Sequence, residues 1–269
     1  MYPLSFEEYY SYVGGEKKAV LDQYMLYGGM PRIALLSDEK DKKTYLTSLY
    51  EELYVKDIVE RNRLKREDIL NDILNYVASQ VGSLTNPTNI ANALTSMRHE
   101  SINPQMISDY LKHTMDAFLI SLARRYDVKG KTCFNYPNKY YYSDIGLRNA
   151  RLNYRQYDPG HIMENIIYNE LVKRGYSVDV GQVTERKGNE KISREIDFVV
   201  NDGDRRIYIQ SAWQMDTEQK ESSELKSLLL TGDYFKKIVI RMDIPHNYYD
   251  DNGFFHCNMM DFLLGDVPM

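Results

Sequence analysis

The sequence predicts a mixed α/β fold with an N-terminal helical segment (residues 1–65), a winged helix-turn-helix (66–150) and a three-layer α/β domain (160–269). Two observations predict it. Apolar residues recur at helical spacing in most segments before residue 145, and short apolar stretches separated by turns dominate after Gly175. The first pattern is typical of amphipathic helices and the second of strands. With 269 residues, 43% of them apolar, the chain is long enough for one large domain or two ordinary ones.

The composition excludes several classes of protein. The formal net charge is −5, so any anionic partner must be bound by a local basic patch. The two cysteines, Cys133 and Cys257, lack the spacing of a zinc site, which favours a reducing compartment. The N-terminus does not have the pattern of a signal peptide, and no stretch approaches the roughly 18 apolar residues of a membrane span. We therefore expect a soluble, cytoplasmic protein without a membrane partner.

Two apolar stripes predict the N-terminal helices. The stretch AVLDQYMLY predicts a helix that ends at Gly28–Gly29, and Pro31 can occupy the first position of the next helix. A second stripe runs through KKTYLTSLYEELYVKDIVER. We expect it to pack against another part of this chain or against a further domain.

Three helices and two strands predict the winged helix-turn-helix. The first helix starts near Ile69, and the next two begin with the pairs Asn86–Pro87 and Asn103–Pro104. Asn is a preferred N-cap, and Pro fits the first helical position. The stretches LISLARRYDV and KYYYSDIGL have the pattern of strands joined by the polar turn KGKTCFNYPN. This order of three helices, strand, wing and strand is that of a winged helix.

Cations gather in and after this wing. From Arg124 to Arg155 there are eight Lys and Arg residues against two Asp, a local charge of +6. Such cations bind nucleic acid by neutralising backbone phosphates. If the protein binds DNA, we expect the contacts to come from Arg124, Arg125, Lys129, Lys131 and Lys139. The alternative is a solvated wing whose charges pair with acidic helices such as the one that carries Glu51. The expected recognition helix has few side chains suited to reading base edges in the major groove, which argues against sequence-specific DNA binding.

The last part of the chain predicts a helix, three strands, a helix and a strand, which form three layers. Carboxylates lie on the second of these strands. Strict alternation would put Glu195 and Asp197 on one face and Ile196 and Phe198 on the other. The third strand places Gln210 and Ala212 on one face by the same rule. Two carboxylates and a third oxygen could bind Mg²⁺ and activate water for phosphodiester hydrolysis, with exposed acids at a sheet edge as the alternative.

No phosphate-binding loop accompanies these carboxylates. The glycine clusters GGEKKAV and YGGMPRI do not match the pattern GxxxxGK[ST]. We therefore expect no cofactor in this chain beyond Mg²⁺ at most, and ATP only where a separate ATPase module supplies its site.

Seven segments in order carry a resemblance to a known family: YPLSFEEYYSY, LDQYMLYGGMPRIAL, SLYEELYVKDIVER, ISDYLKHTMDAFLISLARRYDVKGK, KYYYSDIGLRNA, ENIIYNELVKRGYSVDVG and REIDFVV with YIQSAW. The chain resembles the C-terminal domain of unknown function of a large prokaryotic family of AAA+ ATPases. The resemblance implies the C-terminal portion of a longer ATPase, or a truncated gene product. It also implies a winged helix followed by a restriction-endonuclease-like domain of the PD-(D/E)XK type.

Residue by residue, the resemblance implies a degenerate nuclease site. Glu164 matches the helix acid and Asp197 the first-strand acid. Gln210 stands at the Glu position of Glu-x-Lys and Ala212 at the Lys position, so we expect no cleavage and at most weak metal binding by Asp197 and Gln210. Lys220 or Lys226 could replace the missing lysine. Restoring Gln210→Glu and Ala212→Lys is an engineered test of this resemblance, in which Mg²⁺-dependent cleavage would support the shared architecture.

Three functions follow from these patterns. The first is a non-catalytic, DNA-binding or regulatory region of an AAA+ ATPase. The second is an active metal-dependent nuclease or junction resolvase. The third is a protein-interaction or oligomerisation domain, with an ATPase module or further copies of the chain as partners. The 24 tyrosines of the chain favour this third function, because Tyr is enriched at interfaces.

Overall fold

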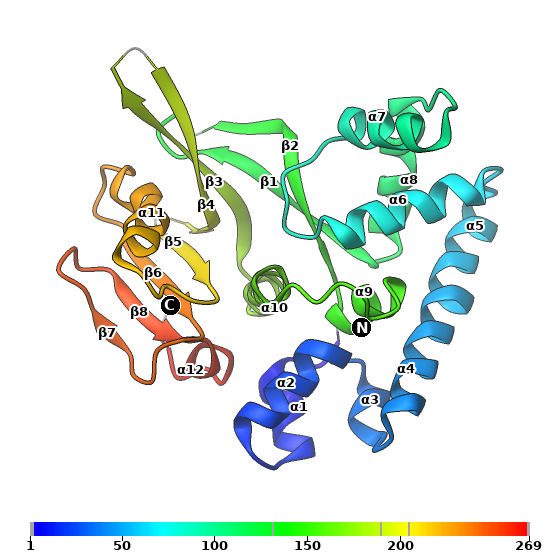
Figure 1. Ribbon diagram of the computed structural model, residues 1–269, viewed down its shortest axis with the longest axis horizontal. Helices are drawn as coiled ribbons and strands as arrows, with labels where there is room; N and C mark the ends of the chain where they lie inside the picture. Colours follow the sequence, from blue (N-terminus) through cyan, green and yellow to red (C-terminus); the bar gives the residue numbers. More distant parts are fainter. Residues whose placement is uncertain (1–2, 131, 189, 204, 268–269) are drawn as a thin grey trace. The chain divides into compact units, whose positions relative to one another are not determined.

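The computed structural model describes residues 3–130, 132–188, 190–203 and 205–267 (Figure 1). The chain divides into two compact units. The first comprises residues 1–122 and 137–158, and the second comprises residues 123–136 and 159–269. The structure is mixed α/β, with a helical N-terminal region and a mixed eight-stranded sheet. Across the part of the chain that the structure describes, no helix combines the length and the apolar character needed to cross a membrane.

The first unit is mainly helical. Its helices are α1 (Phe6–Val13), α2 (Lys17–Tyr27), α3 (Pro31–Leu35), α4 (Glu39–Ser48), the π-helix η1 (Leu49–Val55), α5 (Lys56–Asn62), α6 (Glu67–Ser79), α7 (Pro87–Arg98), α8 (Pro104–Asp116) and α9 (Ile145–Arg151). The side chains of Asn86 and Asn103 cap α7 and α8, and Pro87 and Pro104 occupy the first helical positions, as predicted. Strands β1 (Ile120–Asp127) and β2 (Thr132–Tyr142) follow α8.

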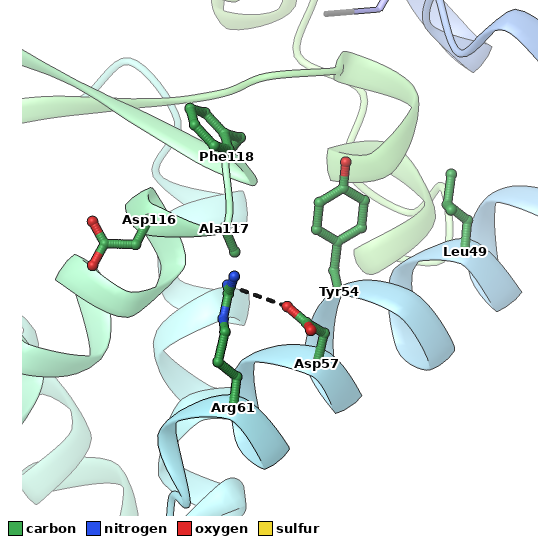
Figure 2. Close-up of a pocket in the computed structure, with 7 residues that line it drawn as sticks. All are labelled: Leu49, Tyr54, Asp57, Arg61, Asp116, Ala117 and Phe118. Atoms are coloured by element: carbon green, nitrogen blue, oxygen red, sulfur yellow. Dashed lines mark ion pairs between the residues drawn. The ribbon is translucent and has the colours of Figure 1, made fainter. Parts of the chain in front are cut away.

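The helix formed by α4, η1 and α5 borders a pocket of about 240 Å³ (Figure 2). Leu49, Tyr54 and the ion pair between Asp57 and Arg61, at 3.1 Å, line it from the helix. Phe118 lines it from the connection that follows α8. The Phe118 ring is 74% exposed, and its backbone has a φ of +57°, a left-handed conformation that is unusual for an aromatic residue.

A buried carboxylate joins α2 to α9 in the first unit. Asp144 caps α9 by accepting a hydrogen bond from the Leu147 N–H at 3.1 Å, and it accepts a second from the Gly29 N–H at 2.7 Å. Gly28 ends α2 with a φ of +72°, as predicted. A Cβ on Gly28 would lie 2.2 Å from Oδ1 of Asp144, and one on Gly146 would lie 2.0 Å from the Tyr27 carbonyl oxygen. Glycine is therefore required for the close approach of the two segments.

The second unit consists of helices around a sheet. Its elements after β1 and β2 are α10 (Pro159–Lys173), β3 (Ser177–Lys187), β4 (Glu190–Asp202), β5 (Arg205–Ala212), α11 (Glu218–Leu229), β6 (Lys236–Arg241), β7 (Tyr248–Tyr249), β8 (Phe255–Asn258) and α12 (Met259–Leu263). The strand order is β2-β1-β3-β4-β5-β6-β8-β7. Strands β3, β4 and β5 form an antiparallel meander, whereas β5, β6 and β8 are parallel.

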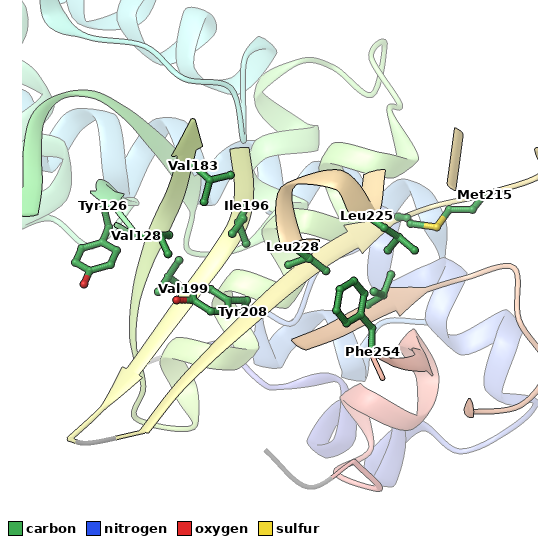
Figure 3. Packing of buried hydrophobic residues seen from close by; sticks show 12 residues of the cluster. Tyr126, Val128, Val183, Ile196, Val199, Tyr208, Met215, Leu225, Leu228 and Phe254 are labelled. Carbon is green, nitrogen blue, oxygen red and sulfur yellow. The ribbon is translucent and has the colours of Figure 1, made fainter. Parts of the chain in front are cut away.

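Helices cover both faces of this sheet. On one face, Leu225 and Leu228 of α11 belong to an apolar cluster with Tyr208 and Ala212 of β5 (Figure 3). On the other face, Tyr168 of α10 packs against Phe198 of β4, with ring centroids 6.4 Å apart. Helix α12 is held to α10 by a hydrogen bond of 2.6 Å from Arg174 to the Phe262 carbonyl. Buried apolar area on both faces supplies the main stabilisation of this unit.

A β-bulge interrupts the alternation of β4. Two residues of β4, Asp197 and Phe198, lie opposite a single residue of β3. Ile196 and Val199 therefore both belong to the cluster under α11, whereas Phe198 faces α10. The prediction that Ile196 and Phe198 share a face is wrong, because the extra residue reverses the alternation. Gly181 pairs with Ile196 beside the bulge, where a Cβ would come within 2.7 Å of the Val199 side chain.

The buried carboxylate of Asp144 predicts a pH-dependent stability. Burial raises its pKa to about 6, despite the hydrogen bonds from backbone N–H groups that favour the charged form. The pKa of an Asp side chain in the unfolded chain is about 3.9. Between about pH 4 and 6 the folded protein therefore holds a proton on Asp144 that the unfolded chain has lost, and the contribution of Asp144 to stability falls as pH rises through this range. The free energy of unfolding decreases by about 3 kcal/mol in total, because one pKa unit corresponds to about 1.36 kcal/mol.

Urea unfolding of the wild type and of Asp144→Asn between pH 4 and 7 checks this. The free energy of unfolding of the wild type should decline relative to the variant as pH rises, because Asn does not titrate. A difference between the two proteins that stays constant with pH would contradict the assignment.

Candidate functional site

The candidate site lies where β4 and β5 separate, beyond their last register pair, Phe198 and Ile209. The Asp197 carboxylate is buried there and reaches across to β5. Its Oδ2 accepts hydrogen bonds from the backbone N–H of Ser211 at 2.8 Å and from the Ser211 hydroxyl at 2.9 Å. The side chain therefore continues the strand pairing after the backbone ladder has ended. Hydrogen bonds to a carboxylate contribute about 1.5–3 kcal/mol each.

Gln210 connects the same point of the sheet to α11. Its Oε1 accepts from the backbone N–H of Asp197 at 3.4 Å, and its Nε2 donates to Oε2 of Glu224 at 3.3 Å. An amide can accept and donate at once, which a carboxylate at this position could not do. Glu224 is a site residue that the sequence did not indicate, because nothing in the spacing of α11 singles it out.

The position expected to carry a lysine faces the core. Ala212 is 7% exposed and belongs to the apolar cluster of α11. The two lysines considered as replacements are both engaged elsewhere. Lys226 pairs with Glu185 at 2.5 Å, and Lys220 pairs with Asp216, just before α11, at 3.8 Å.

The acids expected around a metal ion do not form a suitable site. Glu164 is buried on α10, with its Oε2 3.8 Å from Nδ1 of His161, and Glu195 is half-buried on β4. Within the described ranges, no group of three or more His, Cys, Asp or Glu side chains is arranged to hold a metal. Ser211 donates two hydrogen bonds to Oδ2 of Asp197, and the oxygen of Gln210 accepts one from the Asp197 N–H, so both groups have partners within the fold. Without a cluster of acids around them, the described residues do not fit Mg²⁺, which binds through carboxylates and waters.

The expected basic cluster does not form one surface. Lys139 is 2% exposed and Arg148 is 1% exposed. The Arg148 guanidinium donates to the carbonyls of Ala78 and Gln156 and to the Asn149 side chain. A linear excess of charge cannot reveal this, because Arg has five donors and often satisfies backbone carbonyls in the interior.

Arg151 pairs with an acidic helix, which is the alternative to DNA contact that the sequence left open. Its guanidinium pairs with Glu51 at 2.9 Å and donates to Asn75 and to the Asn71 carbonyl. Its side chain is almost fully buried. This arginine joins helices of the first unit and cannot reach a phosphate.

The other expected DNA contacts lie on β1 and the turn after it. Arg124 and Lys129 are exposed, and Arg125 is half-buried with its Nη2 donating to the Ser193 hydroxyl at 3.0 Å. Lys131 lies outside the described residues. Two of the five expected contacts thus have exposed side chains in the second unit.

Further exposed cations lie on the β3–β4 hairpin, which extends beyond the helices of the second unit in Figure 1. Arg186, Lys187 and Lys191 surround its turn, and Glu190 is the exposed acid among them. We call these three cations the basic arm. The basic arm was not predicted, although the stretch ERKGNEK carries a signal for it: a glycine between charged residues. Gly188 adopts a φ of +62° in this turn.

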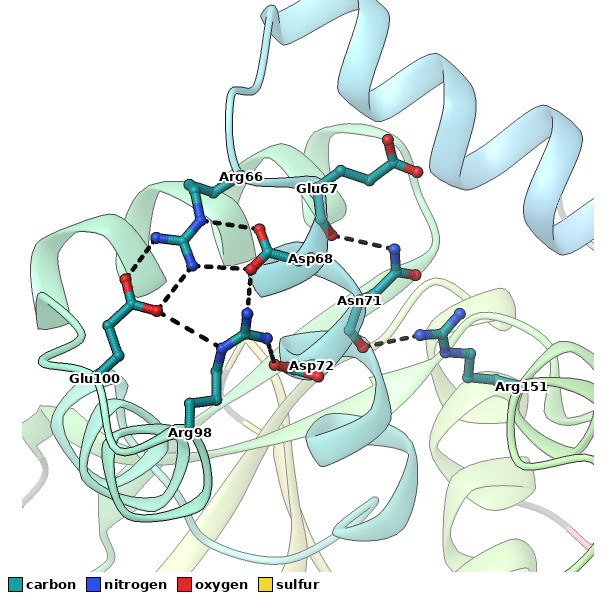
Figure 4. A network of polar contacts seen from close by, with 8 residues as sticks. All are labelled: Arg66, Glu67, Asp68, Asn71, Asp72, Arg98, Glu100 and Arg151. Carbon is teal, nitrogen blue, oxygen red and sulfur yellow. Dashed lines mark hydrogen bonds and ion pairs between the residues drawn. The ribbon is translucent and has the colours of Figure 1, made fainter.

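A polar network in the first unit joins the start of α6 to the end of α7 (Figure 4). Arg66 pairs with Glu100 at 2.7 Å and with Asp68 at 2.8 Å, and Arg98 pairs with Asp68 and Asp72. The Arg66 guanidinium lowers the pKa of Asp68 to about 2. Three carboxylates neutralise two guanidinium groups, so the network holds helices together and offers no basic surface.

Comparisons with known proteins place the chain in a family. Residues 18–158, more than half of the chain, match the family described as "Domain of unknown function (DUF8612)". The chain belongs to this family. Residues 159–256 match "Domain of unknown function (DUF4143)". In this DUF8612 protein, the boundary between the two matches coincides with the boundary between the two units at residues 158 and 159.

Relatives of this DUF8612 protein are longer than the chain. It is 33% identical over 252 residues to an "Uncharacterized protein" of Haemophilus influenzae, covering 89% of this chain and 60% of that protein. It is 27% identical over 240 residues to "Uncharacterized protein MJ1544" of Methanocaldococcus jannaschii, covering 87% and 50%. The crystal structure of protein VC1899 from Vibrio cholerae matches 98% of this chain and 60% of that one, at 12% identity and a TM-score of 0.30.

The environment of Ala212 predicts that restoring the nuclease pattern will fail. Ala212→Lys would place an ammonium group in the apolar cluster, and an uncompensated buried charge lowers the free energy of unfolding by about 3–5 kcal/mol. The matched control is Gln214→Lys, which adds the same charge at an exposed position two residues later. Urea unfolding measures both effects. An Ala212→Lys protein as stable as the control would contradict the assigned environment.

Proposed function

We propose that the chain is a non-cleaving, DNA-binding region of an ATPase-associated protein, built on a nuclease-like scaffold. One observation supports the proposal that the chain does not cleave DNA. At the positions of the nuclease pattern, Asp197 binds Ser211, Gln210 binds Glu224, and Ala212 belongs to the core. Side chains that would hold metal and water in a nuclease contribute to the fold instead.

The arrangement of elements supports a nuclease-like scaffold. Elements α10, β3, β4, β5, α11 and β6 follow the order helix, three strands, helix and strand that the sequence resemblance implies for the PD-(D/E)XK domain. Antiparallel strands β3, β4 and β5 and the parallel addition of β6 agree with a crossover through α11. Helices α6, α7 and α8 with the β1–β2 hairpin have the order of a winged helix.

Association with an ATPase has separate support. The DUF4143 match at residues 159–256 is typical of AAA-ATPase-associated proteins. The chain contains no phosphate-binding loop of its own, and it spans 60% and 50% of the two longer relatives. We therefore propose an ATP-hydrolysing module as its partner.

The basic arm supports DNA as the ligand. Arg186, Lys187 and Lys191 are exposed around one turn, and Lys129 is exposed at the turn of the neighbouring β1–β2 hairpin. Strands β1 and β3 pair in parallel at Arg125 and Val180, so the turns that follow these two strands lie at the same end of the sheet. Cations on projecting hairpins can follow backbone phosphates and bind without reading bases.

A protein-interaction role is the second candidate. Tyr234 is fully exposed after α11, and Tyr249 is 68% exposed on the edge strand β7. Exposed aromatic side chains are typical of binding surfaces. A defined partner captured by a chain that has no affinity for DNA would favour this function over the first.

DNA titrations at several salt concentrations test the proposal. The triple variant Arg186→Ala, Lys187→Ala and Lys191→Ala should weaken duplex binding about tenfold or more and make the salt dependence shallower, because each lost phosphate contact lowers the slope by about 1. The matched control removes three exposed cations of the first unit: Lys17→Ala, Lys18→Ala and Lys40→Ala. Equal affinity of both triple variants, or binding that does not depend on salt, would overturn DNA binding by the arm.

Incubation with plasmid and four-way junctions in Mg²⁺ or Mn²⁺ tests the non-cleaving part. We expect intact DNA after incubation with the wild type. Cleavage by the wild type that is lost in Asp197→Ala would instead establish an active nuclease at this site.

A further inference from the structure

A polar pocket of about 510 Å³ lies against the outward face of α11 in the second unit. It is lined by Arg194, Glu218, Gln219, Ser222, Ser223 and Lys226. Neither the basic arm nor the separation of β4 and β5 includes these residues. The volume is within the range of small-molecule sites, roughly 300–1,000 Å³.

One carboxylate holds the two cations of this pocket. Nε and Nη2 of Arg194 lie 2.9 and 2.8 Å from Oε2 of Glu185, and Nζ of Lys226 lies 2.5 Å from Oε1. The Glu185 side chain is largely shielded, at 12% exposure, whereas Arg194 and Lys226 are exposed to 30% and 41%. The two cations are therefore partly exposed, whereas the carboxylate that pairs with both of them is largely shielded.

The donors of this ion cluster favour an anion. The Lys226 ammonium, and after it the Arg194 guanidinium, lower the pKa of Glu185, so the carboxylate stays charged at neutral pH. The two cations and Glu185 carry a charge of +1, which the Glu218 carboxylate in the pocket lining offsets to zero. Arg has five N–H donors and Lys three, so the bonds to Glu185 use only part of their capacity.

Helical spacing places uncharged donors beside these cations. Gln219, Ser222, Ser223 and Lys226 are three or four residues apart, which puts them on one face of α11. The hydroxyls of Ser222 and Ser223 are exposed on this face. Arg194 stands across the pocket on β4, so donors approach a bound group from two elements.

We propose that this pocket binds the phosphate group of a phosphate ester. A tetrahedral oxyanion can accept from the planar guanidinium, the ammonium and two hydroxyls at once. Its source is either a nucleic acid backbone or a free nucleotide, and both present the same group. The inference goes beyond the proposed function, because it needs no contact from the basic arm.

Calorimetric titration of the full chain with inorganic pyrophosphate, in phosphate-free buffer, tests the pocket. We expect saturable binding that Arg194→Ala or Lys226→Ala weakens about tenfold, since a charge-assisted hydrogen bond contributes about one such factor. Lys220→Ala is the matched control, because Lys220 lies on the same helix and pairs with Asp216 outside the pocket lining. Its affinity should equal that of the wild type.

A variant of opposite sign separates binding from folding. Glu185→Gln removes the negative charge beside both cations and should tighten pyrophosphate binding severalfold, whereas a cluster with only a structural role would give no gain. Circular dichroism confirms that each variant is folded. Absence of saturable binding, weakening by Lys220→Ala as large as that by Lys226→Ala, or weaker binding by Glu185→Gln overturns the proposal.

Parallel titrations with ADP and with a short single-stranded oligonucleotide identify the source of the phosphate. Tighter binding of the oligonucleotide, lost in Arg194→Ala, assigns a nucleic acid backbone, and tighter binding of ADP assigns a nucleotide. Binding of neither, with pyrophosphate also unbound, overturns the site. The triple variant of the basic arm should retain pyrophosphate binding, so failure of DNA binding by the arm is distinguishable from failure of the pocket.

Discussion

The two hydrogen bonds from Ser211 to Asp197 join β4 to β5 at the point where the backbone pairing of these strands ends. The bulge in β4 lies at the same point, at Asp197 and Phe198. Gln210 and Ala212 are adapted to this arrangement, one as a bridge to α11 and the other as a core residue.

Charge is used differently in the two units. In the first unit, arginines such as Arg66, Arg98 and Arg148 satisfy carboxylates and backbone carbonyls, and their contribution is internal. In the second unit, cations gather at hairpin turns and beside α11, where solvent can reach them. The net charge of −5 conceals this division. A protein of acidic composition can offer a local site for anions when its cations project and its acids are paired.

Much of the fold could be predicted from the sequence, because local rules govern it. Asn–Pro pairs start α7 and α8, Gly28 ends α2, and the alternating stretches become β3, β4 and β5. The residues of the candidate site could be named from the sequence, but their contacts could not. Asp197 and Gln210 do lie together, but the bulge and the partner Glu224 depend on contacts between distant segments that no spacing encodes. The basic cluster was misjudged for the same reason, since position along the chain does not tell whether an arginine points inward.

The link between Gly29 and Asp144 has a consequence for synthesis of the protein. The two residues are separated by 115 positions, and Asn149 reaches the Met25 carbonyl across 124. Contacts of such separation form slowly, because a long loop must close before they contribute. On the ribosome, the first helices would wait, incompletely packed, until α9 has emerged. Helices α1 and α2 therefore stay open to aggregation during synthesis until α9 is available to pack against them.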